Sequence, residues 1–227
     1  MKKIYIIGVL LLGTFILNGC TSNKYKEELL NEKLNEMYNN YSIVDSCSYW
    51  NEAGGDELES IVKVENDYFL SSINVHNKQI SAYEEQKILQ QEQYNDYIYI
   101  IETTSYYDNT SVVFFVDDSI EKNYVANYIT DFCLNYSEND KVEGFYIDVY
   151  YVLDFDKNKT IYKEFAVSQT ANRCDYEFYK RYKEKVGIIN DFQQYRQWLP
   201  TKIHESYKNN YKEYIKEKLA ETNFQWN

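Results

Sequence analysis

Short segments rich in β-branched and aromatic residues, each bounded by turn residues, predict three β-hairpins along the chain. The middle hairpin is apolar on both faces. We expect it at the centre of a sheet, because strands buried on two faces have continuous apolar runs. The hairpins are residues 58–75 with a break at Asn66-Asp67, residues 96–104 with 111–116, and residues 144–155 with 160–168.

Apolar residues at helical spacing predict helices after each hairpin and near the N-terminus. This order of elements predicts an α+β fold, in which helices pack on one face of an antiparallel or mixed sheet of about three hairpins. Two helices are expected to end the chain. The predicted helices cover residues 22–40, 77–93, 119–136, 173–198 and 201–222, whereas residues 42–56 look irregular.

The apolar residues of the third predicted hairpin specify its register. If residues 156–158 form the loop, Ile147 and Val149 face Val167 and Phe165, and a slip by one residue would bury a glutamate. The opposite face then gathers aromatic rings and carboxylates from both strands. These residues are Tyr146, Asp148, Tyr150, Tyr162 and Glu164.

This strip is the candidate binding site. Tyrosine rings and carboxylates together can hold a cationic peptide or a sugar through stacking, cation–π contacts and ion pairs. The alternative is an ordinary half-buried sheet face under a helix, since aromatic residues are common on such strands. The aromatic and basic run at residues 176–185 likewise fits either a core stripe with a solvated face or a surface for anionic lipid or wall polymer.

The N-terminus combines a basic head with a short apolar segment. Lys2 and Lys3 precede residues 4–17, which are almost wholly apolar. As a helix this segment would be about 21 Å long, against a hydrocarbon core of roughly 30 Å. It is therefore typical of a signal peptide rather than of a transmembrane helix.

The end of this segment resembles the lipobox of bacterial lipoprotein precursors. Leu17, Gly19 and Cys20 match that motif, while Asn18 replaces the usual small residue. The resemblance implies cleavage between Gly19 and Cys20 and a diacylglyceryl group on Cys20, and two acyl chains give stable membrane attachment. The chain would then face outside the cytoplasm; the alternative is an uncleaved membrane segment.

The domain organisation follows from this N-terminus. We expect a signal peptide at residues 1–19, a lipid-anchored tether or helix at residues 20–42, and one α+β domain at residues 43–227. No linker rich in proline, glycine or serine divides that last part.

Charge narrows the possible partners. The formal net charge is −12, and residues 20–172 carry 28 Asp+Glu against 11 Lys+Arg, whereas residues 173–227 carry 8 against 11. An acidic body disfavours nucleic acid, whose phosphates need cationic side chains, and it attracts cationic peptides. The 26 tyrosines reflect either binding surfaces or a nucleotide bias that also enriches asparagine, lysine and isoleucine.

Cysteines and motifs give little sign of catalysis. Cys47, Cys133 and Cys174 allow at most one internal disulfide with three possible pairings, and Cys133, beside a helical apolar stripe, is expected to be a buried thiol. No C-x-x-C, P-loop, G-x-S-x-G or H-E-x-x-H motif is present, so we expect no cofactor and no metal site.

The sequence therefore predicts a non-enzymatic lipoprotein of the bacterial cell envelope that binds a cationic peptide or an envelope protein. Immunity to a cationic antimicrobial peptide is one version of this role. An envelope hydrolase that uses a carboxylate pair such as Asp148 and Glu164 is the first alternative. A structural component of an envelope complex is the second.

Overall fold

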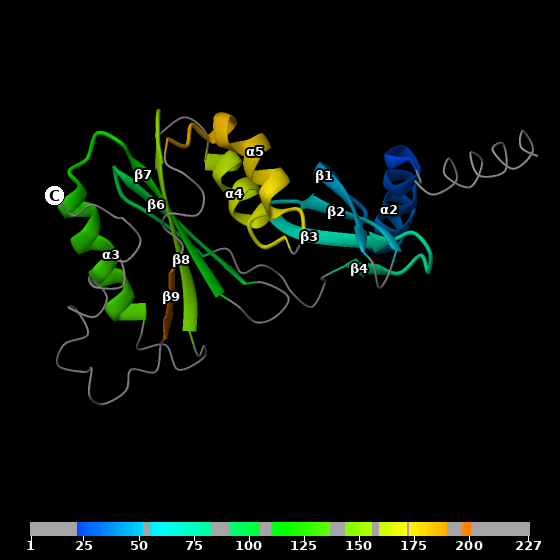
Figure 1. Ribbon diagram of the computed structural model, residues 1–227, viewed down its shortest axis with the longest axis horizontal. Coiled ribbons are helices and arrows are strands. Elements are labelled where there is room, and N and C mark those ends of the chain that lie inside the picture. Colours follow the sequence, from blue (N-terminus) through cyan, green and yellow to red (C-terminus); the bar gives the residue numbers. More distant parts are fainter. Residues whose placement is uncertain are drawn as a thin grey trace, which may run out of the picture. The chain divides into compact units, whose positions relative to one another are not determined.

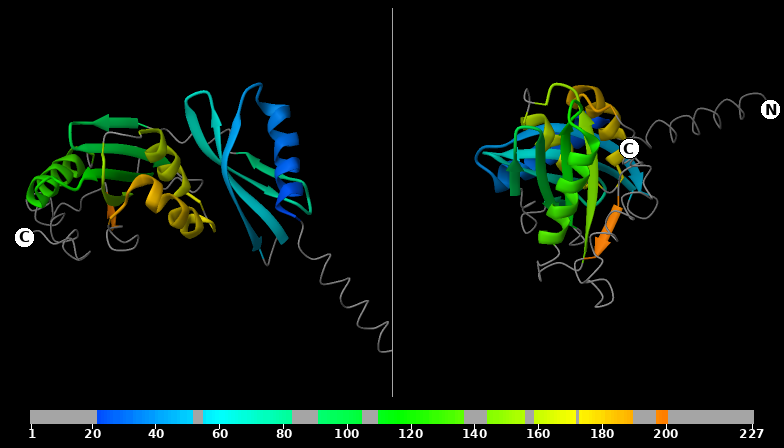
Figure 2. Two further views of the ribbon diagram at one scale, coloured as in Figure 1. Left: turned by 90° about the horizontal axis from the view of Figure 1, so that it is seen from above. Right: turned by 90° about the vertical axis from the view of Figure 1, so that its left-hand side faces the viewer.

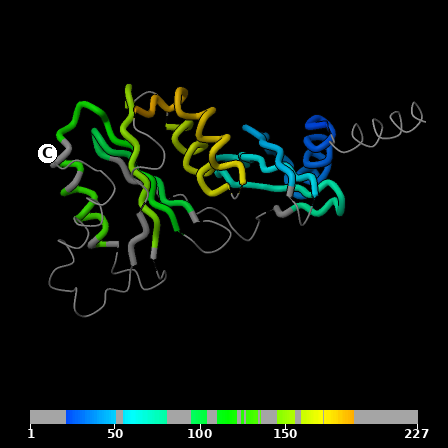
Figure 3. Tube along the Cα trace, viewed as in Figure 1, coloured from blue at the N-terminus to red at the C-terminus, as the bar shows by residue number. Residues whose placement is uncertain are grey.

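The computed structural model describes residues 22–51, 55–82, 91–104, 110–136, 144–155, 159–171, 173–189 and 197–200. They form two compact units, the first of which ends at Ala82. Figures 1 and 2 show the helices and strands of each unit, and Figure 3 traces the chain. The predicted α+β class is confirmed. The signal peptide lies outside the described residues, and the folding of residues 43–227 as one domain stays a prediction.

The first unit is a four-stranded sheet with the order β1-β2-β3-β4 and one helix, α2 (Asn23–Met37). This helix confirms the one predicted at residues 22–40, and it buries Leu29, Leu30 and Leu34. The first predicted hairpin is also confirmed, as β2 and β3. The strands are β1 (Ser42–Asn51), β2 (Gly55–Val64), β3 (Asp67–Asn74) and β4 (Ile80–Ala82).

Strand β1 lies where the sequence suggested irregular structure, and that interpretation was wrong. It pairs with β2 along its whole length in antiparallel register, with an irregularity between Ile43 and Asp45. Polar residues face each other inside this pair, and the hydroxyls of Ser46 and Ser60 are 2.9 Å apart. Such a strand has little apolar alternation of its own, so its partner strand decides its structure.

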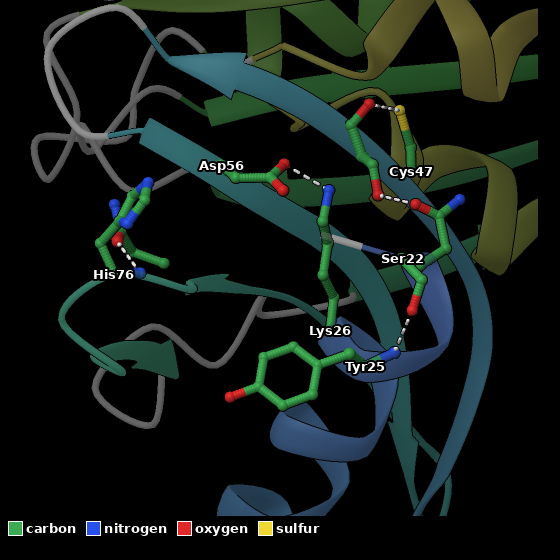
Figure 4. Close-up of polar contacts among 9 residues, drawn as sticks. Ser22, Tyr25, Lys26, Cys47, Asp56 and His76 are labelled. Atoms are coloured by element: carbon green, nitrogen blue, oxygen red, sulfur yellow. Dashed lines mark hydrogen bonds and ion pairs between the residues drawn. The ribbon is translucent and has the colours of Figure 1, made fainter. Parts of the chain in front are cut away.

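A buried ion pair joins α2 to the sheet. The ammonium group of Lys26 on the first turn of α2 donates a hydrogen bond to the carboxylate of Asp56 on β2 (Figure 4). Both side chains are at least nine-tenths buried. Buried charges are tolerated only when they are paired, because each one loses its hydration. The pair therefore fixes the first turn of α2 against the start of β2.

The second unit is a five-stranded sheet with the order β5-β6-β7-β8-β9. The middle predicted hairpin is confirmed: β6 and β7 pair in antiparallel fashion, and β7 lies at the centre of the sheet. β8 runs parallel to β7 after the connection through α3. The strands are β5 (Gln91–Tyr94), β6 (Ile98–Thr104), β7 (Thr110–Asp117), β8 (Gly144–Val152) and β9 (Gln197–Pro200).

Helix α3 (Lys122–Tyr136) covers one face of this sheet, as Figures 1 and 2 show. Val125 and Ile129 on the helix belong to one buried apolar cluster with Phe114 of β7 and Val149 of β8. The helix confirms the prediction for residues 119–136, since its apolar residues recur at the expected spacing.

Helices α4 (Lys159–Ser168) and α5 (Asp175–Val186) pack against each other and cover the opposite face. The ring of Tyr162 on α4 stacks on Phe115 of β7 at a centroid distance of 4.5 Å and an interplanar angle of 15°. Helices therefore lie on both faces of the second sheet, rather than on one face as the sequence suggested.

Residues 160–168 correct the prediction for the third hairpin, because they form α4 instead of a second strand. The predicted pairing of Val149 with Phe165 is therefore absent, and β8 pairs with β7 and β9. Tyr162, Phe165 and Ala166 are spaced as on one helical face, and all three are buried. Apolar and polar residues also alternate along residues 160–168, as they do in a strand. Packing on the aromatic face of the sheet therefore decides between a helix and a strand.

Two further predicted helices differ from the structure. Of residues 77–93, those that the structure describes include β4 and the start of β5, so the helix prediction is wrong for them, while residues 83–90 lie outside the described part. The helix predicted at 173–198 is shorter: α5 ends at Val186, and the C-cap Gly187 has the left-handed conformation (φ 76°) that is typical of a helix C-terminus. β9 follows along the chain. The helix predicted at residues 201–222 lies outside the described part.

The cysteines differ in oxidation state. Cys47 and Cys174 are each in a disulfide bond, whereas Cys133 is a free thiol without solvent exposure. Burial raises the pKa of the Cys133 thiol. This confirms the prediction that Cys133 is a buried structural thiol, since a neutral thiol in an apolar site behaves as a small hydrophobe.

The buried pair gives a stability prediction. We expect Asp56→Ala to lower the free energy of unfolding by about 3–5 kcal/mol, because it leaves the Lys26 ammonium buried and unpaired. The double variant Lys26→Met with Asp56→Leu should recover most of that loss. Urea unfolding of the full chain measures both values.

The matched control is the exposed ion pair of Lys33 and Glu36 on the same helix, at 3.0 Å. Lys33→Ala should change the stability by less than about 1 kcal/mol, since exposed pairs contribute little. Equal losses in Asp56→Ala and Lys33→Ala would show that burial of the Lys26 pair has no energetic consequence.

Candidate functional site

The structure divides the five residues of the predicted binding strip between a strand and a helix. Tyr146, Asp148 and Tyr150 share one face of β8, as their alternation predicts. Tyr162 and Glu164 lie on α4 and not on a neighbouring strand. Asp148, Tyr150 and Tyr162 are buried, while Tyr146 and Glu164 are half-buried. Binding by these residues stays a prediction, but a ligand would reach little of the strip.

Most of this strip has a packing role. Tyr150 meets Phe165 of α4 edge-on at 4.9 Å. The Tyr162 hydroxyl donates to the Phe155 carbonyl at 3.0 Å, and that of Tyr150 donates to the Gln169 side chain at 3.4 Å. Buried tyrosines need such partners, because an unpaired hydroxyl in an apolar site is costly.

The aromatic and basic run at residues 176–185 forms the core stripe with a solvated face that was one of its two predicted interpretations. Phe178, Tyr179 and Tyr182 form the buried side of α5. Tyr176 is 52% exposed, and the Lys180 ammonium lies 4.2 Å from the centre of its ring. The helix therefore combines a core stripe with a solvated basic face.

A different set of tyrosines is exposed, at one end of the second sheet. Tyr97, in the turn before β6, is 45% exposed, and Tyr124 of α3 is 46% exposed. Tyr128, one helical turn after Tyr124, is half-buried, and the two rings stack at 6.3 Å with 24° between their planes. We call the stacked pair Tyr124 and Tyr128, together with Tyr97 of the turn that Asn95 links to α3, the tyrosine patch.

Asn95 holds this patch together. Its side-chain oxygen accepts hydrogen bonds from the backbone N–H groups of Tyr97 (2.9 Å) and Ile98 (2.7 Å), which fixes the turn. The same side chain bonds with the Tyr128 hydroxyl on α3. In addition, the N–H of Asp117 donates to the Tyr97 carbonyl at 2.9 Å. The turn, the end of β7 and α3 therefore meet at one place.

Exposed carboxylates lie near the patch along the chain. Asp96 is next to Tyr97 in sequence, and Asp118 and Glu121 lie in the loop that leads into α3; all three are exposed. The Tyr124 N–H bonds to the Glu121 carbonyl at 3.0 Å, so the backbone of this acidic loop adjoins the first turn of α3. Aromatic faces next to carboxylates favour cationic ligands over neutral or anionic ones.

The Tyr128 hydroxyl reports on this environment. Burial raises its pKa, the neighbouring Tyr124 raises it further through charge repulsion, and the hydrogen bond with Asn95 acts in the opposite direction. Because the folded-state pKa lies above the unfolded value, the associated stability is present at neutral pH. It is lost as the pH rises through the pKa of Tyr128. The Tyr128 hydroxyl is therefore uncharged at neutral pH.

The described residues contain no group of three or more His, Cys, Asp or Glu side chains placed to hold a metal ion. Among the same residues, no helix has the length and apolar character needed to cross a membrane. Comparison with known proteins adds no relative: no family model matches the chain, and neither a curated protein nor a solved structure is significantly similar.

Sequence reasoning missed the tyrosine patch for a definable reason. Tyr97 lies within the predicted middle hairpin, which is apolar on both faces, and Tyr124 directly precedes Val125 on the buried side of α3. The available signal was weak, because residues next to a buried helical position can be either buried or exposed. The surface itself arises only from the pairing of Asn95 with Tyr128.

Proposed function

We propose that this protein is a lipid-anchored binding protein of the bacterial cell envelope that faces outside the cytoplasm and binds cationic peptide segments. The observation that carries the ligand class is the exposed tyrosine patch with Asp96, Asp118 and Glu121 beside it. Stacking and cation–π contacts hold the ligand, and the carboxylates attract it. The ligand is either a free peptide or a basic segment of an envelope protein.

The anchor is proposed from the sequence around Cys20. Leu17, Gly19 and Cys20 follow a short apolar segment with a basic head, which is the pattern of a lipoprotein precursor. The disulfide-bonded state of Cys47 and Cys174 supports an oxidising compartment outside the cytoplasm, since disulfides persist in such places.

The acylation of Cys20 has a direct test. A labelled fatty acid fed to the producing cell should label the wild-type protein, because Cys20 carries the lipid, and should not label Cys20→Ala. Cys133→Ala is the control, since it removes a cysteine that is buried and unreactive. Equal labelling of wild type and Cys20→Ala would contradict the anchor.

Ligand binding is tested by calorimetry with a lysine-rich peptide and a glutamate-rich peptide of the same length. We expect binding of the lysine-rich peptide alone, and weaker binding as salt concentration rises. Tyr124→Ala should weaken that binding by roughly 5–30-fold, which corresponds to the loss of about 1–2 kcal/mol of cation–π and packing energy.

Tyr176→Ala is the matched control, because Tyr176 is as exposed as Tyr124 but lies beside Lys180 on a basic helix face. It should leave the affinity unchanged. Binding that does not weaken with salt concentration, or an equal loss of affinity in Tyr124→Ala and Tyr176→Ala, would refute the tyrosine patch as the binding surface.

A further inference from the structure

The N-terminal end of α2 lies close to the proposed lipid. Ser22 is the N-cap of α2, and its side chain accepts a hydrogen bond from the Tyr25 N–H at 3.3 Å (Figure 4). Cys20 precedes Ser22 by two residues. Because a residue spans at most about 3.5 Å, a lipid on Cys20 would be joined to the N-cap of α2 by a tether of no more than about 7 Å.

The hairpin end of β1 and β2 lies at the same end of α2. The Ser48 hydroxyl donates to the Asn23 side chain at 2.8 Å, and Asp56 pairs with Lys26, as described above. Trp50 stands directly opposite Asp56 in the strand register. Two contacts thus place Trp50 beside the first turn of α2, a short distance along the chain from Cys20.

Trp50 is exposed but supported. Its side chain is 59% exposed, and its ring meets that of His76 at 6.2 Å with an interplanar angle of 88°. The His76 ring in turn occupies the space above Gly55, where an added Cβ would approach it to 2.0 Å. Gly55 also has a φ of +92°, which other residues rarely adopt. The backbone at Gly55 therefore leaves room for a ring that supports the indole.

The exposed side chains at this end have the chemistry of a membrane interface. Tyr25 on the first turn of α2 is 41% exposed, and Lys24 beside it is exposed. Tryptophan and tyrosine concentrate at the level of lipid headgroups, because their rings are apolar and their tips are polar. A lysine at the same level keeps its ammonium in the headgroup region.

We propose that Trp50 and Tyr25 insert into the headgroup region of the bilayer that holds the Cys20 lipid. This inference rests on the proposed lipid anchor. The first unit then lies on the membrane with the start of α2 toward the lipid, instead of hanging from a long tether. The tyrosine patch belongs to the second unit and takes no part in this contact.

Depth-dependent quenching tests the inference on the full chain, purified from the membranes of producing cells. Trp198→Phe and Trp226→Phe leave Trp50 as the only tryptophan. In vesicles of phosphatidylcholine and phosphatidylglycerol, Trp50 emission should shift to the blue. Lipids spin-labelled near the headgroup should quench it more than lipids labelled deep in the chain. Quenching of Trp50 by aqueous acrylamide should be several-fold weaker in the presence of vesicles than for the detergent-free protein without vesicles.

The control reporter is Asn66→Trp in the same background with Trp50→Phe. Asn66 lies in the turn between β2 and β3, at the far end of β2, a distance of about 30 Å along the strand. Its emission should stay open to acrylamide and unaffected by the spin-labelled lipids.

The outcomes separate the inference from the anchor. Intact mass shows whether the purified protein carries a lipid on Cys20. If it does and Trp50 is as open to acrylamide as the indole of the Asn66→Trp variant, the membrane contact is overturned while the anchor stands. If no lipid is present, the anchor fails and this inference fails with it.

Discussion

The buried ion pair of Lys26 and Asp56 is the constraint on which the first unit depends. Removing two charges from water is expensive, and their attraction offsets that cost only while both stay in place. α2 therefore cannot separate from the sheet without breaking this pair. Since the helix begins three residues after Cys20, the pair also determines which end of the unit adjoins the proposed lipid.

In the second unit, packing decides which tyrosines remain for binding. The sheet is covered on both faces, so Tyr150 and Tyr162 are used in its core and their hydroxyls bond internally. Tyr97 and Tyr124 are not part of this core. Tyr97 lies on a turn and Tyr124 lies on the outer side of α3, and both are exposed. A tyrosine-rich chain thus has two populations of the same residue, of which only the exposed one can meet a ligand.

How far the sequence predicts the structure differs between elements for physical reasons. α2, α3 and the hairpin of β6 and β7 follow from their periodicity, because each has a continuous apolar side. Residues 160–168 fit both a helix and a strand, and only contact with the face that contains Phe115 selects α4. β1 depends on β2 for its pairing, and the tyrosine patch depends on a bond between Asn95 and α3, which no local pattern contains.

Native-state hydrogen exchange on the full chain tests whether α2 is part of the first unit or a loose tether between lipid and sheet. The relevant amides are those of Leu30 and Leu34 on α2 and of Ile61 and Val62 on β2, all buried. If the buried pair locks the helix, both sets should open with the same free energy, within about 1 kcal/mol. Amides of α2 that exchange near the rate of an unfolded peptide, while β2 stays protected, would contradict the account.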